Sequence, residues 1–276
     1  MTVCRLWFCI FILVITIALF GGKLFNVTLN QVLFNLTMLN GFFGVEHVDG
    51  VYWSLVVELK FYILIGIVLL FKKIKYIKLL GYFLLAISIL QLYIPFGEAP
   101  KFLQIIYYVT FARWNPYFVA GMFFYLMKSN NNIIKNIIPI IIAYIVALRY
   151  AVITLELRND LYGYGFSKEV VIALITLFFI AILLISTNKL NVLNKRIFMS
   201  FGILTYPLYL LHQNIGYILF NNLGNYINKW ILLISVMSLM LIASYLISKR
   251  IENPLGTYLR RKLKANPYLL RLKTKF

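Results

Sequence analysis

Apolar residues recur along this chain in runs of about twenty, the length of α-helix that crosses a bilayer, and short polar stretches separate the runs. The pattern predicts an all-α fold, a polytopic transmembrane helix bundle of about eight spans. We place them near residues 5–22, 51–71, 76–96, 102–127, 133–154, 168–187, 201–220 and 229–248.

Composition agrees with a membrane location. Of the 276 residues, 62% are hydrophobic and 13% are charged, whereas soluble domains are about 45–50% apolar. This argues against a water-soluble fold and makes the lipid bilayer the first partner. We expect one transmembrane domain over residues 1–250 and a basic cytoplasmic tail over 251–276.

The net charge of +19 does not indicate a nucleic-acid partner, because the basic residues flank the apolar runs and form no single patch. They gather in the loops near 72–78, 128–135 and 189–196 and in the C-terminal tail, all on one side of the predicted membrane. Because cytoplasmic loops carry an excess of Lys and Arg, both termini are predicted to be cytoplasmic. The expected location is the inner (plasma) membrane.

Two ionisable residues, Glu58 and Lys60, lie inside the second predicted span, where such groups are costly and usually functional. Ser54, Glu58 and Tyr62 share one helix face at intervals of four, and Lys60 points elsewhere. We therefore expect Glu58 to pair with Arg113 of the fourth span. The pair is either a structural ion pair or part of a substrate site, and the sequence leaves both open.

The seventh span carries a second polar face. Pro207 suits the first turn of a helix with Thr205 as its cap. Tyr209, His212 and Gly216 then share one side, and the neutral imidazole of His212 can accept a hydrogen bond or a proton. A purely structural histidine is the alternative interpretation.

The loop before the second span is a weaker candidate. Glu46, His47 and Asp49 can in principle act as acid and base or bind a metal, but one histidine and two carboxylates are weak evidence. We predict no metal site. No phosphate-binding, serine-hydrolase or zinc-binding pattern is evident either.

Three segments resemble signatures of the acyltransferase type 3 family of membrane O-acyltransferases. Residues 49–62 (DGVYWSLVVELKFY) resemble the Trp-Ser-Leu-x-x-Glu stretch that opens a span in that family. Residues 205–214 (TYPLYLLHQN) resemble the second signature, and residues 251–254 (IENP) resemble the Glu-x-Pro after the last span. The three occur in the family's order and cover almost the whole chain.

The resemblance implies transfer of an acyl group, usually acetyl, from cytosolic acyl-CoA to a hydroxyl of an extracytoplasmic or cell-surface carbohydrate, such as lipopolysaccharide. Acyl-CoA is then the donor substrate, and no bound cofactor is expected. We predict supporting catalytic roles for Glu58 and His212. The predicted substrate-binding residues are Trp53, Ser54, Tyr62, Arg113, Tyr206, Tyr209 and Asn214.

One departure from the family pattern affects the predicted activity. The family's chemistry centres on a histidine in its first span, shortly after an arginine, and this chain has no such pair. Its beginning resembles a later family span, so the sequence suggests an N-terminally truncated member. Two alternatives stay open at this stage. One is an inactive remnant, and the other is a polar-lipid or sugar transporter or flippase, although internal repeats typical of transporters are not evident.

The charge distribution makes the orientation testable. A fluorescent reporter that folds only in the cytoplasm is expected to be bright when fused after Phe276, because the basic tail is held on the cytoplasmic side. Alkaline phosphatase fused at the same point should be inactive. An active phosphatase fusion would reverse the predicted topology.

Overall fold

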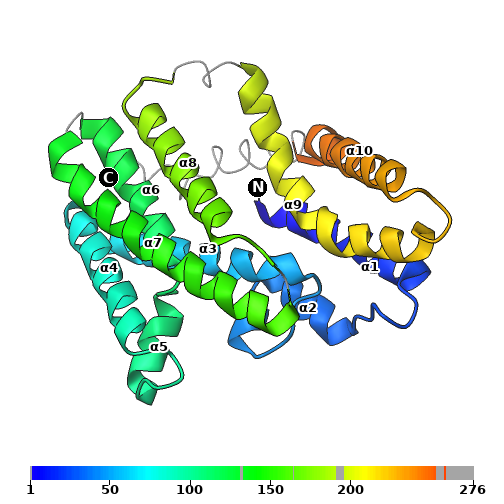
Figure 1. Cartoon of the computed structure of the whole chain (residues 1–276), viewed down its shortest axis with the longest axis horizontal. Helices are drawn as coiled ribbons and strands as arrows, with labels where there is room; N and C mark the ends of the chain where they lie inside the picture. Colours follow the sequence, from blue (N-terminus) through cyan, green and yellow to red (C-terminus); the bar gives the residue numbers. More distant parts are fainter. Residues whose placement is uncertain (1, 131–132, 164, 191–195, 253–257, 259–276) are drawn as a thin grey trace. The chain divides into compact units, whose positions relative to one another are not determined.

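The computed structural model describes residues 2–130, 133–163, 165–190, 196–252 and 258. Within these residues every regular element is helical, which confirms the all-α prediction for this part of the chain (Figure 1). Five helical stretches there are long and apolar enough to cross a bilayer: Gly50–Leu70, Ile74–Tyr93, Ile133–Tyr162, Lys168–Ser186 and Lys229–Arg250. Leu6–Phe20 is a shorter apolar helix. The predicted number of spans and the orientation of the termini stay predictions.

The chain forms two compact units. We call residues 1–56 with 196–276 the terminal unit, and residues 57–195 the central unit. Helix α3 (Trp53–Leu70) belongs to the terminal unit up to Val56 and to the central unit from Val57. The predicted basic tail 251–276 lies almost wholly outside the described residues.

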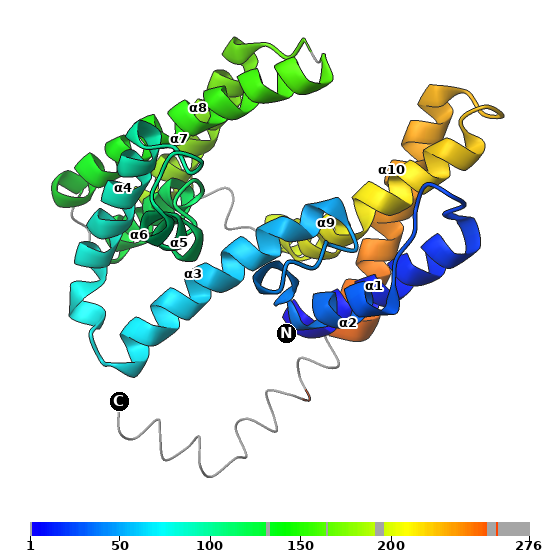
Figure 2. The ribbon, with the colours of Figure 1, turned by 90° about the horizontal axis from the view of Figure 1, so that it is seen from below.

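The terminal unit is built around α9 (Arg196–Leu223), which contacts both α1 (Thr2–Phe20) and α10 (Lys229–Ile247). Helix α2 (Leu29–Thr37) lies beside α1 (Figure 2). Short turns η1 (Asn40–Phe42) and η2 (Gly50–Tyr52) follow it, and the π-helical turn η5 (Ser248–Glu252) follows α10. The core consists of apolar side chains with almost no exposed surface, among them Leu6, Ile10, Leu13, Leu210, Leu211 and Ile218.

The predicted helix start at Pro207 is wrong, because α9 begins eleven residues earlier, at Arg196, and continues through the proline. Pro207 has no N–H, so the carbonyl of Ile203 loses its usual helical donor. Ser248 Oγ lies 3.4 Å from that carbonyl oxygen and donates to it instead. Thr205 is not a cap, because its hydroxyl donates to the carbonyl of Gly202 at 2.7 Å. The hydroxyl of Ser248 thus replaces the backbone donor that the proline lacks, and the helix continues through Pro207.

The central unit contains η3 (Ile74–Tyr76), α4 (Ile77–Tyr93), α5 (Lys101–Val109), α6 (Asn115–Asn130), α7 (Ile133–Tyr162) and α8 (Lys168–Ser186), together with most of α3. Helix α7 contacts α4, α6 and α8. Gly81 of α4 permits close packing on α6, because a Cβ at this position would lie 2.8 Å from Cε2 of Phe123. Phe123 is fully buried in the apolar core.

The predicted fourth span, 102–127, is not one helix. The chain leaves helical geometry between α5 and α6, where Phe111 has a left-handed φ of 44°. Such a break frees backbone carbonyls, which need partners where water is scarce. Three side chains supply them: Lys60 Nζ lies 2.9 Å from Tyr108 O, Ser88 Oγ 2.5 Å from Ala112 O, and Asn115 Nδ2 3.4 Å from Thr110 O.

Asn115 is central to this arrangement. It is fully buried, its amide also donates to the carbonyl of Leu84 at 2.9 Å, and its Oδ1 contacts the hydroxyl of Ser88. Tyr150 joins the cluster by donating to the carbonyl of Ser88 at 2.8 Å. Buried polar side chains from α4, α6 and α7 thus hold the break in place. Hydropathy does not reveal this cluster, because its members come from three helices that are distant in sequence.

We expect Asn115→Ala to destabilise the protein, because the carbonyls of Leu84 and Thr110 lose a buried donor. The expected loss is about 1–3 kcal/mol, read as a lower midpoint of thermal unfolding in detergent. Asn221→Ala, at an exposed position of α9, is the control and should leave the midpoint unchanged. Equal midpoints for the two variants would show that Asn115 does not hold the break.

Candidate active site

The segment that leads into α3 is attached to α9 by a buried carboxylate. Asp49 is fully buried, and its two oxygens accept from the backbone N–H of Val51 at 3.3 Å and of Asn214 at 3.2 Å. The side-chain amide of Asn214 donates to the carbonyl of Val48 at 3.0 Å. Burial raises the pKa of Asp49, and these hydrogen bonds partly oppose the rise. The predicted substrate-binding residue Asn214 is thus engaged in joining two segments of the terminal unit.

Ser54 and Tyr209, both predicted to bind substrate, are brought together by this attachment. Their hydroxyl oxygens are 2.7 Å apart, and Tyr209 also donates to the carbonyl of Val51 at 2.8 Å. The hydroxyl of Ser54 also lies within reach of the Val51 carbonyl, at 3.2 Å, so the two hydroxyls share this acceptor and either can donate to the other. Tyr52 adds a further link by donating to the carbonyl of Leu210 at 3.2 Å. The position of α9 next to the start of α3 is therefore fixed by several polar contacts.

His212 is held in one tautomer. Its Nδ1 lies 2.9 Å from the carbonyl oxygen of Tyr209, and a carbonyl can only accept. In the neutral imidazole Nδ1 therefore carries the proton, and Nε2 keeps an unprotonated lone pair. The side chain is exposed and close enough to Asp49 for an electrostatic interaction. This arrangement is typical of a histidine that can accept a proton.

His212 lines a cavity of about 690 Å³ between α9 and α10. Tyr209 and Gly216 line it too, which confirms the prediction that these three residues share a face. Thr205 and Gln213 add polar groups, while the α10 wall is apolar, formed by Leu233, Val236, Met237, Met240 and Leu241. The α9 side of the cavity thus mixes polar groups with Leu208 and Phe220, and the α10 side suits hydrocarbon.

The predicted ion pair between Glu58 and Arg113 is not formed. Glu58 instead accepts from the phenol of Tyr62, one turn further along α3, at 2.5 Å. Arg113 turns to α7, where its Nη2 donates to Thr154 Oγ1 at 2.5 Å. Glu58 and Arg113 therefore each hydrogen-bond another residue in place of the predicted partner. Lys60 is directed away from Glu58, as predicted, and lies 3.2 Å from the ring centroid of Tyr108.

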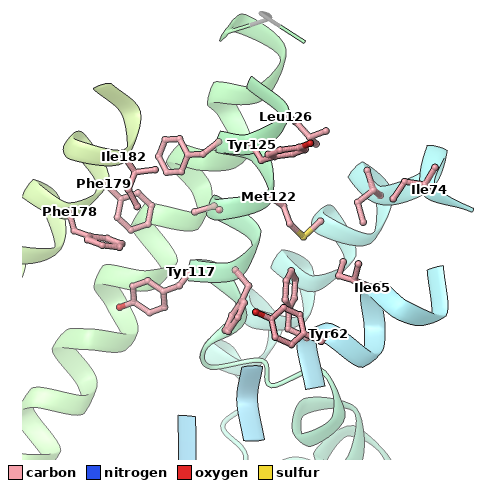
Figure 3. Close-up of a pocket in the computed structure, with 16 residues that line it drawn as sticks. Tyr62, Ile65, Ile74, Tyr117, Met122, Tyr125, Leu126, Phe178, Phe179 and Ile182 are labelled. Atoms are coloured by element: carbon pink, nitrogen blue, oxygen red, sulfur yellow. The ribbon is translucent and has the colours of Figure 1, made fainter. Parts of the chain in front are cut away.

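A second cavity, of about 660 Å³, lies in the central unit and is almost wholly apolar (Figure 3). Tyr62 lines it and is the residue that binds Glu58. Ile65, Met122 and Phe179 are among its other walls. Glu58, Tyr62 and Arg113 thus belong to the central unit. Ser54, Tyr209, His212 and Asn214 belong to the terminal unit.

Trp53 and Tyr206, the other predicted substrate-binding residues, also lie in the terminal unit. Trp53 is 40% exposed, and Tyr206 packs partly buried against the apolar core. In the preceding loop, Asn40 Nδ2 lies 2.9 Å from His47 Nδ1, so the imidazole accepts from the amide. Burial lowers the pKa of His47. His47 and Asp49 therefore hydrogen-bond different residues. No group of three metal-ligating residues occurs in the described part of the chain.

Comparison with known proteins identifies the family of the chain. A family model described as an acyltransferase domain, that of acyltransferase 3, matches residues 2–249. The chain belongs to the acyltransferase 3 family. No curated protein and no solved structure matches it. With several apolar helices of spanning length, this acyltransferase 3 protein is a multi-pass membrane protein.

Within the acyltransferase 3 chain, sequence reasoning missed Asp49 as the anchor of the site. The sequence indicates it only as a weak acid–base or metal candidate and as the first residue of the 49–62 segment, four residues before Trp53. A signal was present, because an acidic residue directly before a helical segment is a common capping arrangement, and Asp49 does cap η2 through Val51. Its second contact, with Asn214, joins residues 165 positions apart and has no local signal.

We expect Asp49→Ala to lower the unfolding midpoint, because two partly buried N–H groups lose their acceptor, at about 1 kcal/mol each. Glu46→Ala, exposed in the same loop, is the control. The pKa of Asp49 is raised in the folded protein, so ionising it costs folding free energy. The advantage of wild type over Asp49→Ala should therefore be largest in acid and shrink as the pH rises above 3.8, the ordinary value. An advantage that grows with pH would contradict this assignment.

Proposed function

We propose that this protein is a membrane O-acyltransferase. It moves an acyl group, acetyl in the first instance, from cytosolic acyl-CoA to a hydroxyl of an extracytoplasmic carbohydrate, in the plasma (inner) membrane. The family match over residues 2–249 supports the acyltransferase class. The single structural observation that carries the proposal is the unprotonated Nε2 of His212 at a cavity that can hold a substrate.

The proposed reaction has a simple balance. A sugar hydroxyl attacks the thioester carbonyl, a C–O bond forms, the C–S bond breaks, and the CoA thiol takes up the proton. His212 supports the attack by accepting a hydrogen bond or the proton from the hydroxyl at Nε2. The carbonyl of Tyr209 holds the imidazole through Nδ1, so Nε2 is the nitrogen that is left to accept.

Glu58 and Tyr62 have a different proposed role. Their short hydrogen bond sets a polar group beside the apolar cavity of the central unit. We assign this pair to substrate positioning within the central unit. Trp53 and Ser54 are assigned to substrate binding within the terminal unit. The family match favours this enzymatic function over the transporter alternative, which no comparison supports.

Membranes from cells that produce the protein should transfer radiolabelled acetyl from acetyl-CoA to an envelope glycan fraction. His212→Ala is expected to slow the initial rate by about tenfold or more, since a positioned base contributes about 10²–10⁴. Glu58→Gln should reduce it less. His47→Gln replaces the only other histidine and is the matched control, with the rate unchanged.

The outcomes separate the parts of the proposal. Unchanged transfer in His212→Ala would remove this residue from the reaction. Absence of transfer from acetyl-CoA and from longer acyl-CoA donors, with the protein present in the membrane in normal amount, would overturn the acyltransferase assignment.

A further inference from the structure

The central unit contains a smaller cavity, of about 410 Å³, where the start of α6 meets the end of α7 and the start of α8. Its polar and aromatic lining comprises Trp114, Tyr117, Tyr150, Thr154, Arg158 and Phe166. Tyr117 lines the apolar cavity too, and its hydroxyl points away from Tyr62 (Figure 3). Neither the proposed reaction nor the family signatures use this cavity.

Arg113 reaches the wall of this cavity through Thr154. The hydroxyl of Thr154 donates to the carbonyl of Tyr150 at 2.6 Å, so its oxygen accepts from Nη2 of Arg113. The Nε of Arg113 is buried and has no hydrogen-bond partner. A buried guanidinium nitrogen without a partner is costly in a low-dielectric region. Arg113 does not itself line the cavity, so its positive charge acts on the cavity from behind Thr154.

Arg158 adds a second positive charge, one helical turn beyond Thr154 and in the cavity lining. Neither arginine forms an ion pair with a carboxylate in the described part of the chain. The nearby acidic residues are engaged or do not line the cavity: Glu156 pairs with Lys168 at 3.7 Å, and Glu169 accepts from Ser167 at 2.6 Å. Asp160 is exposed on α7 and is not part of the lining.

Aromatic rings share the rest of the wall with Ala151, Leu155 and Val171, and hydrogen bonds hold the backbone of Phe166 and the hydroxyl of Tyr150. Phe166 is fixed by Asn159, whose side chain exchanges two hydrogen bonds with its backbone, at 3.0 and 3.2 Å. The hydroxyl of Tyr150 is tied to the carbonyl of Ser88 at 2.8 Å. The guanidinium of Arg113 lies 5.7 Å from the ring centroid of Trp114. Flat rings beside guanidinium groups suit a sugar ring that carries a negative charge.

We propose that the cavity flanked by Arg113 and Arg158 binds an anionic sugar, a ring bearing a phosphate or a carboxylate. Guanidinium groups recognise both anions through paired N–H donors. The assignment of this sugar to the acyl acceptor rests on the proposed function, whereas the binding itself does not. The cavity would then select charged carbohydrates over neutral ones.

Trp114 lines the cavity and provides a local signal. In the purified protein, tryptophan fluorescence should change saturably with glucose 1-phosphate or with glucuronate, but not with glucose. The two anions distinguish a phosphate from a carboxylate as the recognised group. Trp114→Phe should abolish the change, which would place the signal in this cavity.

The arginine variants test the charges. Arg158→Gln, which removes the guanidinium that lines the cavity, should weaken binding by at least about tenfold, and Arg113→Gln, which removes a charge behind the lining, should weaken it less. Lys168→Gln removes the same charge at the start of α8 but does not line the cavity, and it should bind as wild type does. Arg158 is exposed, so its replacement keeps the test valid if Arg113→Gln fails to fold.

Three results would overturn the proposal: no saturable change with either anion, an equal response to glucose, or unchanged affinity in the Arg158→Gln protein. If CoA binds and neither sugar gives a response, the cavity would be assigned to the acyl donor instead of the sugar, and the proposal would be wrong. Because fluorescence needs no acyl transfer, failure here leaves the proposed reaction standing. A protein that binds the anion but transfers no acetyl would support the anion site and contradict the proposed reaction.

Discussion

A backbone polar group surrounded by apolar helices must find its partner inside the protein, and this constraint organises both units. In the central unit the break between α5 and α6 exposes carbonyls that Lys60, Ser88 and Asn115 then satisfy. In the terminal unit Ser248 serves the carbonyl that Pro207 leaves without a donor. Irregular backbone thus occurs where buried polar side chains from distant parts of the chain can reach it.

The same constraint shapes the candidate active site. Asp49 satisfies the backbone of both α9 and its own turn, and Tyr52, Ser54 and Tyr209 tie the start of α3 to the same helix. These contacts fix the backbone that carries His212. The imidazole then needs only the carbonyl of Tyr209 to be held in the tautomer that leaves Nε2 open to the cavity. Residues that hold the backbone, such as Tyr209, therefore lie close in sequence to His212 but have a different role from it.

Sequence reasoning succeeded where the signal was local and repeated. Long apolar runs predicted the helices, and spacing predicted the shared face of Tyr209, His212 and Gly216 as well as the outward turn of Lys60 from Glu58. It failed where a single polar residue decided the outcome. Asn115 and Ser88 stabilise a break inside a run that hydropathy treats as one span. The choice of Tyr62 by Glu58, and of Thr154 by Arg113, depends on distances between side chains that hydropathy does not encode.

The packing of Gly81 against Phe123 has a consequence for sequence variation. Glycine is a poor helix former, so selection for helix stability alone would replace it. Every missense codon change at this position adds at least a Cβ, which would press on the edge of the fully buried ring of Phe123. We therefore expect substitutions of Gly81 to be tolerated only when residue 123 becomes smaller at the same time. The two positions are expected to vary together across lineages, large with small.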